Sequence, residues 1–218
     1  LPDGIKPVAE SRQSHFKSAL TLFDKSESNK TRVFVKIQDG CNGFCSYCQI
    51  PYARGASRSV APNQVVEEVK RLVDEGIREV VFTGIHIGDY GKDLKVFNGT
   101  NGLPFVKILN EILSTTNIPR IRISSLEPAE FTDDLAKIMK SNRAFCDHLH
   151  FPLQSGSDKI LKAMNRQYDK ERYLQSIITA REVFENPFIG CDIIPGFPGE
   201  TEDDFEETFE FIKKCKLT

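Results

Sequence analysis

Apolar residues recur along the chain with two alternating periods. Short runs rich in Val, Ile and Phe predict strands, and apolar positions spaced three and four residues apart predict the helices between them. The predicted strands span residues 33–37, 79–83, 120–124, 148–151 and 188–194. The predicted helices span residues 63–75, 105–113, 132–140 and 170–184, and a last helix follows Thr201, which is expected to cap it. Strands that alternate with helices in this way predict an α/β fold with a parallel sheet, either open and doubly wound or closed as a barrel.

The segments that contain unusual residues all follow the carboxyl end of a predicted strand. They span residues 41–48, 84–86, 125–127, 152–154 and 195–200. In (β/α) barrels the active site lies at this end of the strands. The sequence therefore predicts one functional face to which several strands contribute.

Composition restricts the class of protein more than it indicates a function. With 39% apolar and 28% charged residues among 218, the chain is typical of a soluble globular protein. Its 29 basic and 31 acidic residues nearly balance, so overall charge gives no sign of a nucleic-acid partner. A local basic set is more typical of a solvated face; it comprises Lys25, Lys30, Arg32, Lys36, Arg54 and Arg58. The sequence has no apolar run of membrane-spanning length and no signal-peptide pattern, which predicts a cytoplasmic protein with reduced thiols and no membrane partner.

Half of the six cysteines lie close together, as Cys41, Cys45 and Cys48. Structural zinc sites use four ligands, and most electron-transfer 4Fe–4S clusters use four cysteines. No other Cys or His lies near enough in sequence to be a fourth local ligand. Three such thiolates can cap three irons of a 4Fe–4S cluster and leave the fourth iron open, unless a residue distant in the sequence supplies a fourth ligand. A cluster is expected rather than zinc; the alternatives to a cluster are a zinc knuckle and three packed thiols. The remaining cysteines lie in apolar or helical stretches and are predicted to be core residues: Cys146, Cys191 and Cys215.

The cysteine spacing, with Tyr47 before the last cysteine, resembles the signature of radical S-adenosylmethionine enzymes. Residues 49–55, Gln-Ile-Pro-Tyr-Ala-Arg-Gly, continue in the manner of the methylthiotransferase family. Further similar segments extend the resemblance from Arg32 to the end of the chain; they span residues 36–41, 51–59, 83–91, 120–128 and 148–156. The resemblance implies a radical S-adenosylmethionine partial (β/α)6 barrel over residues 31–218, truncated after about five βα units. Residues 1–30 are then expected to be a linker or lead-in from a missing N-terminal domain.

The resemblance also implies a role for each candidate site residue. Cys41, Cys45 and Cys48 would hold the cluster, and the amino and carboxylate groups of S-adenosylmethionine would fill the open iron site. The implied cofactor contacts are Tyr47 at the adenine, Gly84 and His86 in a turn at the methionine amino group, Ser125 and Gln154, Arg166 at the methionine carboxylate, and Ile194 beside the adenine. In family members, a sulfur-supplying second 4Fe–4S cluster lies in the N-terminal domain.

Several of these assignments have simpler structural alternatives. His86 has the alternative of a polar residue with protein partners at the mouth of the barrel, and Ser125 and Glu127 are equally explained as caps of the following loop. Arg166 has the alternative of a surface ion pair. Residues 192–201 alone would be a Pro/Gly turn before a capped helix.

The resemblance indicates a substrate branch as well. Only Ala56 separates the Arg-Gly and Ser-Arg pairs, which favours the branch that adds a methylthio group to C2 of N6-threonylcarbamoyladenosine in tRNA. The implied partners are tRNA and a flavodoxin-type electron donor, and the isolated chain is expected to cleave S-adenosylmethionine without thiolating RNA. The alternatives are the isopentenyladenosine branch, the ribosomal-protein branch and a non-enzymatic metal-binding module.

Overall fold

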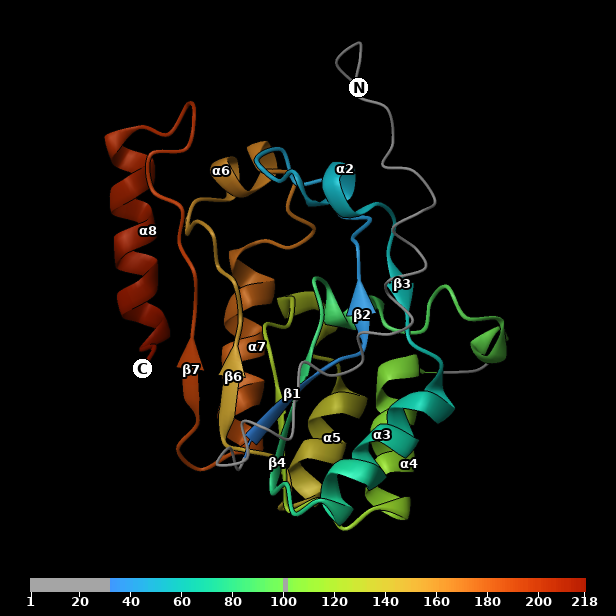
Figure 1. Cartoon of the computed structure of the whole chain (residues 1–218). Helices are drawn as coiled ribbons and strands as arrows, with labels where there is room; N and C mark the ends of the chain where they lie inside the picture. Colours follow the sequence, from blue (N-terminus) through green and yellow to red (C-terminus); the bar gives the residue numbers. More distant parts are fainter. Residues whose placement is uncertain (1–31, 100–101) are drawn as a thin grey trace. The chain divides into compact units, whose positions relative to one another are not determined.

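The computed structural model describes residues 32–99 and 102–218 (Figure 1). These residues form two compact units. Unit 1 contains the described part of Leu1–Gly43 together with Cys48–Ser124, and unit 2 contains Phe44–Tyr47 and Ser125–Thr218. The lead-in expected at residues 1–30 lies outside the described residues.

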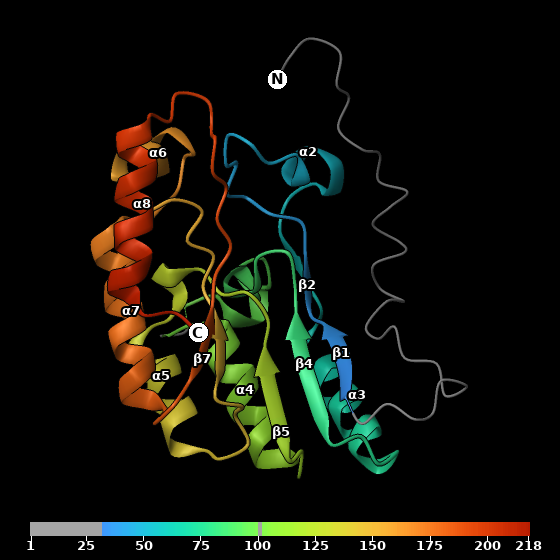
Figure 2. The ribbon, with the colours of Figure 1, turned by 90° about the vertical axis from the view of Figure 1, so that its left-hand side faces the viewer.

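Unit 1 is built on a parallel sheet. Strand β4 (Glu79–Thr83) lies between β1 (Arg32–Lys36) and β5 (Arg120–Ile123), and it runs parallel to both. Helices α3 (Pro62–Asp74) and α4 (Pro104–Thr115) pack against each other and cover one face of this sheet (Figure 2). Proline starts both helices at a position where its missing N–H costs no hydrogen bond.

A small hairpin stands beyond the carboxyl end of β1. Strand β2 (Gln38–Asp39) pairs antiparallel with β3 (Arg58–Ser59), and α2 (Ile50–Arg54) lies between them in sequence. Two 3-10 turns, η3 (Ile87–Asp89) and η4 (Lys95–Phe97), follow β4. Apolar periodicity predicted none of these elements, because elements this short span too few residues to show a period.

Unit 2 continues the same strand and helix alternation. Its parallel strands are β6 (His148–His150) and β7 (Phe188–Gly190). Its helices are η5 (Pro128–Glu130), α5 (Asp133–Ser141), α6 (Asp158–Ala163), α7 (Lys170–Val183) and α8 (Glu202–Cys215). Gly156 lets α8 come close: its N–H donates to Thr208 Oγ1 at 2.9 Å, and a Cβ there would lie 2.6 Å from the Thr208 Cα.

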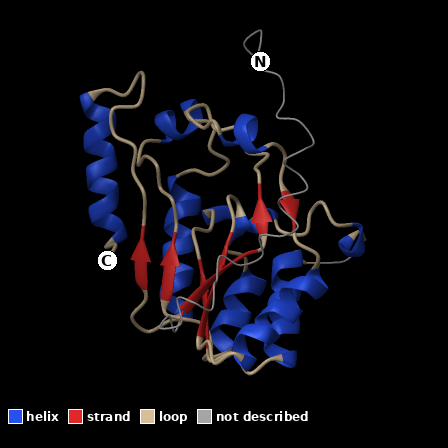
Figure 3. Ribbon diagram, in the orientation of Figure 1, coloured by secondary structure: helices blue, strands red, loops and turns tan. Residues whose placement is uncertain are grey.

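The structure confirms the predicted strands and long helices, with shifts of a few residues at their ends (Figure 3). The strand predicted at residues 188–194 ends at Gly190, and Ile193 then pairs with Gln154 only as an isolated bridge. Thr201 caps α8 as expected, in a reciprocal arrangement with Asp204. No helix within residues 32–99 or 102–218 has both the length and the apolar character needed to cross a membrane.

Candidate functional site

The three clustered cysteines are free thiols, and each is half-buried. Cys41 follows β2, Cys45 lies in the Phe44–Tyr47 segment of unit 2, and Cys48 comes just before α2. Soft thiolate sulfurs are the ligands that iron–sulfur clusters use. Sulfurs that are reduced and partly accessible fit such a cluster.

Gly40 fixes the start of the cysteine loop. Its φ of 71° lies in the left-handed region, and a Cβ there would lie 2.1 Å from the carbonyl oxygen of Ala56. The N–H of Cys41 then donates to Gly55 O at 3.2 Å. Only glycine meets both conditions, so the approach to Cys41 depends on this residue.

Buried Gln38 joins the cysteine loop to the turn after β4. Its Nε2 donates to Gly40 O and to Ser57 Oγ, each at 2.8 Å, and its Oε1 accepts from the His86 N–H at 2.9 Å. Gly84 permits this contact, because a Cβ there would lie 2.7 Å from Gln38 Oε1. The close approach at Gly84 is therefore to a protein side chain in this structure.

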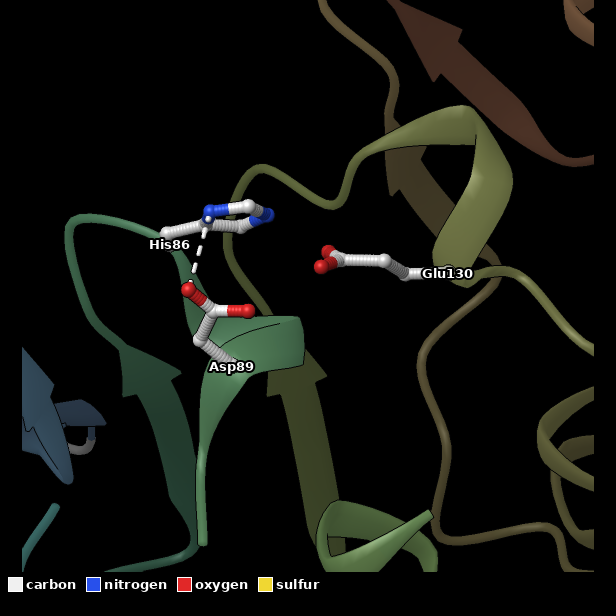
Figure 4. A group of neighbouring side chains, drawn as sticks. All are labelled: His86, Asp89 and Glu130. Atoms are coloured by element: carbon white, nitrogen blue, oxygen red, sulfur yellow. Dashed lines mark ion pairs between the residues drawn. The ribbon is translucent and has the colours of Figure 1, made fainter. Parts of the chain in front are cut away.

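His86 lies beside the first cysteine of the motif. Its Nδ1 is 3.6 Å from Cys41 Sγ and 3.4 Å from the carboxylate of Asp89, the pair drawn with a dashed line in Figure 4. The backbone N–H of Gly43 also donates to Cys41 Sγ, at 3.3 Å. His86 thus has protein partners, which agrees with the alternative of an ordinary polar residue. It also lies beside Cys41, a predicted cluster ligand.

Asp39 organises the basic residues around the loop. Its buried carboxylate accepts from the Gly40 N–H at 2.9 Å and pairs with Arg58 at 2.6 Å, Arg54 at 3.3 Å and Lys36 at 3.6 Å. Burial alone would raise the pKa of Asp39, but these donors and cations more than offset it and lower the pKa below 3.8. Asp39 therefore remains a carboxylate at neutral pH.

The second cysteine is fixed within unit 2. Ser46 donates from its N–H to Met164 O at 3.1 Å and from its hydroxyl to Ala163 O at 2.9 Å. Asn165 Nδ2 donates to Phe44 O at 3.0 Å. These bonds attach the Phe44–Tyr47 segment to the end of α6 and bring Cys45 next to Arg166.

Arg166 connects several candidate site residues of unit 2. Its Nη1 lies 3.2 Å from Cys45 Sγ and 3.3 Å from the hydroxyl of Tyr47, and its Nη2 forms an ion pair with Glu127. Its guanidinium also stacks 4.9 Å from the ring centre of Tyr168. The alternative of a surface ion pair for Arg166 is half right. The ion pair exists, but it does not lie on the surface, because the arginine side chain is only 7% exposed.

The environment of Arg166 keeps it charged. Burial alone would lower its pKa, but the Glu127 carboxylate raises it above the ordinary arginine value. Glu127 also caps η5 in a reciprocal arrangement with Glu130, as the loop-capping alternative predicted. Glu127 thus serves both the turn and the arginine.

Ser125 belongs to a row of polar side chains at the carboxyl ends of strands. Its hydroxyl lies 3.1 Å from His150 Nδ1, and His150 Nε2 lies 3.3 Å from the carboxylate of Asp192. The pattern of apolar residues did not identify His150 or Asp192 as site residues. Only their positions, at or just after the ends of β6 and β7, could have pointed to them.

Gln154 and Ile194 are joined through their backbones. Gln154 has a φ of 64°, its N–H donates to Asp192 O at 2.8 Å, and its carbonyl accepts from the Ile194 N–H at 2.8 Å. Both residues are half-buried. A non-glycine residue in the left-handed region is uncommon, and it persists only where the surrounding contacts hold the backbone in that conformation.

The other cysteines differ from one another. Cys146 and Cys215 are buried, as predicted, and burial raises the pKa of Cys215 to about 11. The core assignment is wrong for Cys191, which is half-buried because the chain leaves β7 just before it.

Comparison with known proteins finds a matching family and several enzymes of similar sequence. The radical SAM superfamily matches residues 35–212. The chain is 41% identical over 192 residues to the threonylcarbamoyladenosine tRNA methylthiotransferase MtaB of Bacillus subtilis, covering 88% of this chain and 41% of that protein. It is 43% identical over 186 residues to the tRNA-2-methylthio-N(6)-dimethylallyladenosine synthase of Carboxydothermus hydrogenoformans, covering 85% of this chain and 41% of that protein. The chain therefore spans less than half the length of these relatives.

Solved structures agree on the fold. The radical S-adenosylmethionine methyltransferase TsrM from Kitasatospora setae superposes with a TM-score of 0.68 at 17% identity, covering 86% of this chain and 34% of that one. Coproporphyrinogen III oxidase HemN from Escherichia coli gives a TM-score of 0.57 at 18% identity, covering 84% of this chain and 41% of that one. The fold expected from the sequence, a radical SAM partial barrel, is thus confirmed. The family match, over most of the described residues, shows that this chain belongs to the radical SAM superfamily.

Proposed function

We propose that this chain is the catalytic core of a tRNA methylthiotransferase that modifies C2 of N6-threonylcarbamoyladenosine. The observation that carries the proposal is the set of free thiols at Cys41, Cys45 and Cys48, inside a sequence similar to two kinds of tRNA methylthiotransferase. The short Arg54-Gly-Ala-Ser-Arg58 stretch supports the threonylcarbamoyladenosine branch. As a tRNA-modifying enzyme the protein would work in the cytoplasm.

The donor set determines which cofactors the site would hold. Cys41, Cys45 and Cys48 would ligate a 4Fe–4S cluster and leave one iron for S-adenosylmethionine. When bound, these two groups supply the radical that removes hydrogen from an unactivated carbon. The proposed S-adenosylmethionine contacts are Tyr47, Gly84, His86, Ser125, Gln154, Arg166 and Ile194.

The role proposed for Arg166 follows from its partners. Its charge is maintained by Glu127, and a charged guanidinium donates strong hydrogen bonds to a carboxylate. In this position Arg166 would orient the methionine carboxylate while it donates to the sulfur of Cys45. Hydrogen bonds to cluster sulfurs also tune the reduction potential.

Complete methylthiolation would need components outside this chain. We assign the sulfur supply to a second 4Fe–4S cluster in another part of a longer protein, and electron delivery to a flavodoxin-type donor. The chain alone would cleave S-adenosylmethionine without thiolating RNA.

Two measurements test this function. After anaerobic reconstitution, the chain should bind iron and sulfide and release 5′-deoxyadenosine from S-adenosylmethionine under reducing conditions. Binding of one zinc and no iron would instead indicate a non-enzymatic metal-binding module. For the substrate, a deletion strain complemented with the full-length gene should regain the methylthio form of N6-threonylcarbamoyladenosine, detected by nucleoside mass spectrometry. Recovery of only the isopentenyladenosine product, or of a modified ribosomal protein, would assign another branch.

A further inference from the structure

The ring nitrogen Nδ1 of His86 lies close to two groups that accept hydrogen bonds. It is 3.6 Å from Cys41 Sγ. It is also 3.4 Å from Asp89 Oδ2, the contact drawn in Figure 4. All three residues belong to unit 1. The sulfur comes from the loop after β2 and the other two residues from the turn after β4, so the contact joins the ends of two strands.

These two neighbours determine which ring nitrogen carries a proton. A neutral imidazole has an N–H on one nitrogen and a lone pair on the other. The Asp89 carboxylate, paired with the Lys92 ammonium at 2.6 Å, is an acceptor, and a cysteine that ligates iron is a thiolate and therefore also an acceptor. A lone pair on Nδ1 would face two electron-rich atoms, whereas an N–H there is attracted by both. On this ground we assign a proton to Nδ1 of His86.

Hydrogen bonds hold the histidine and the cysteine loop together. The His86 N–H donates to Gln38 Oε1 at 2.9 Å, and Gln38 Nε2 donates to Gly40 O at 2.8 Å. One buried side chain thus connects the histidine to the residue before Cys41. The Asp89 N–H donates to His86 O at 3.0 Å, within the turn at η3. The backbones that carry the ring and the sulfur are therefore fixed relative to each other.

The histidine and its carboxylate are largely shielded from solvent. The side chain of His86 is 21% exposed and that of Asp89 is 9% exposed. Water competes less for a hydrogen bond in such a place, and the lower local dielectric strengthens the effect of a donor on a charged sulfur. Lys92 binds the other oxygen of Asp89, which helps to fix the carboxylate that orients the ring.

We infer that His86, oriented by Asp89, donates a hydrogen bond to the sulfur of Cys41 and raises the reduction potential of the cluster that this cysteine holds. Reduction adds negative charge, part of which resides on the sulfur ligands, so a donor stabilises the reduced cluster more than the oxidised one. Partners of this kind orient metal ligands and tune the metal. The inference rests on the proposed function for the presence of the cluster. It is separate from the contact with S-adenosylmethionine, because it concerns the sulfur.

A redox titration of the reconstituted chain without S-adenosylmethionine tests the inference, with the reduced cluster followed by electron paramagnetic resonance. In His86→Leu, the ratio of reduced to oxidised cluster at a given potential should fall about tenfold, which for one electron is a shift of about 59 mV to more negative values. His86→Asn should recover most of the shift, because its side-chain amide can supply an N–H group close to the position of Nδ1.

The matched control is His148→Leu, the same substitution at another half-buried histidine. His148 begins β6 and stacks on the ring of Phe188, with the ring centres 5.3 Å apart. This variant should keep the reduction potential of the unsubstituted chain. Iron content and thermal unfolding of each variant would show that the cluster and the fold are intact.

A second measurement does not require His86→Leu to assemble a cluster. The chain would be prepared with isotope-labelled histidine, reconstituted and reduced. Pulsed electron paramagnetic resonance should then detect a weak coupling between the cluster and a histidine nitrogen, and the labelled His86→Asn variant should lack this coupling.

Four results would overturn the inference: an unchanged or more positive potential in His86→Leu, an equal shift in His148→Leu, no coupling to a histidine nitrogen, or a coupling as strong as that of a direct iron–nitrogen bond. The last result would make His86 a ligand of the cluster. A chain that binds no iron would overturn the inference and the proposed function together. An error in the nucleoside branch alone would leave the potential and the coupling as expected.

Discussion

Arg166 donates a hydrogen bond to the sulfur of Cys45 at 3.2 Å, across a sequence separation of 121 residues. The same guanidinium pairs with Glu127 and touches the hydroxyl of Tyr47. A predicted cluster ligand and a predicted cofactor contact therefore share one charged side chain. This arrangement makes Arg166 the residue whose substitution is most informative.

Arg166→Lys should retain the cluster but weaken the binding of S-adenosylmethionine by about tenfold or more. Lysine keeps the charge, yet one ammonium group cannot replace the fork that reaches Cys45, Tyr47 and Glu127 together. Anaerobic equilibrium dialysis with labelled S-adenosylmethionine measures the affinity, and iron analysis is the control. Unchanged affinity would remove Arg166 from the cofactor site.

Glu127→Ala should lower the free energy of unfolding by about 3 kcal/mol, because it leaves a buried guanidinium without its carboxylate. The double variant Glu127→Ala with Arg166→Met should recover part of this loss, since no charge then stays buried. Urea unfolding of the unsubstituted chain, the two single variants and the double variant gives the coupling free energy between Glu127 and Arg166. Additive effects of the two substitutions would show that the pair is not coupled in solution.

Substitution of Cys41, Cys45 or Cys48 by Ala should abolish binding of a 4Fe–4S cluster, because two thiols cannot hold the cubane. Cys191→Ala is the matched control, since Cys191 is also half-buried and should leave iron binding intact. Iron and sulfide analysis after anaerobic reconstitution measures the outcome. Normal iron content in any of the three variants would exclude that cysteine as a ligand.

Gly40→Ala should prevent cluster assembly through a change in the backbone. An added Cβ would lie 2.1 Å from Ala56 O, so the hairpin that leads into Cys41 would have to shift. Gly76→Ala is the control: Gly76 also has a positive φ, of 87°, but nothing lies within 4 Å of its added Cβ. The control should cost about 1 kcal/mol of stability and retain iron. Equal iron content in both variants would contradict the steric argument.

Glu79 should make the free energy of unfolding depend on pH in the acid range. Burial alone would raise its pKa, but hydrogen bonds from Arg122 and Arg120 outweigh burial and hold the pKa below 4.5. A carboxylate with a lowered pKa contributes stability above its unfolded-state pKa and loses it as the pH falls through the folded-state value. Between about pH 5 and about pH 3, the unsubstituted chain should therefore lose more unfolding free energy than Glu79→Gln. Parallel pH profiles for the two proteins would contradict this assignment.

The sequence by itself determined the order of the strands and long helices. Apolar periodicity is a local property that tertiary packing then exploits, so the helix at α3 and the strand at β4 could be predicted from their own residues. The sequence also identified the three predicted cluster ligands, because their spacing is contained within one loop: Cys41, Cys45 and Cys48. The resemblance to known enzymes supplied the fold that periodicity left open.

Only the tertiary structure decided which distant side chains meet. Nothing local to Gln38 indicates that it will accept the His86 N–H, and nothing local to Glu127 indicates that it will pair with Arg166. The convergence of Arg54 and Arg58 on Asp39 likewise depends on the pairing of β2 with β3. The physical reason is that contacts between residues far apart in sequence are made when strands and turns pack, whereas periodicity and ligand spacing are set by neighbours along the chain.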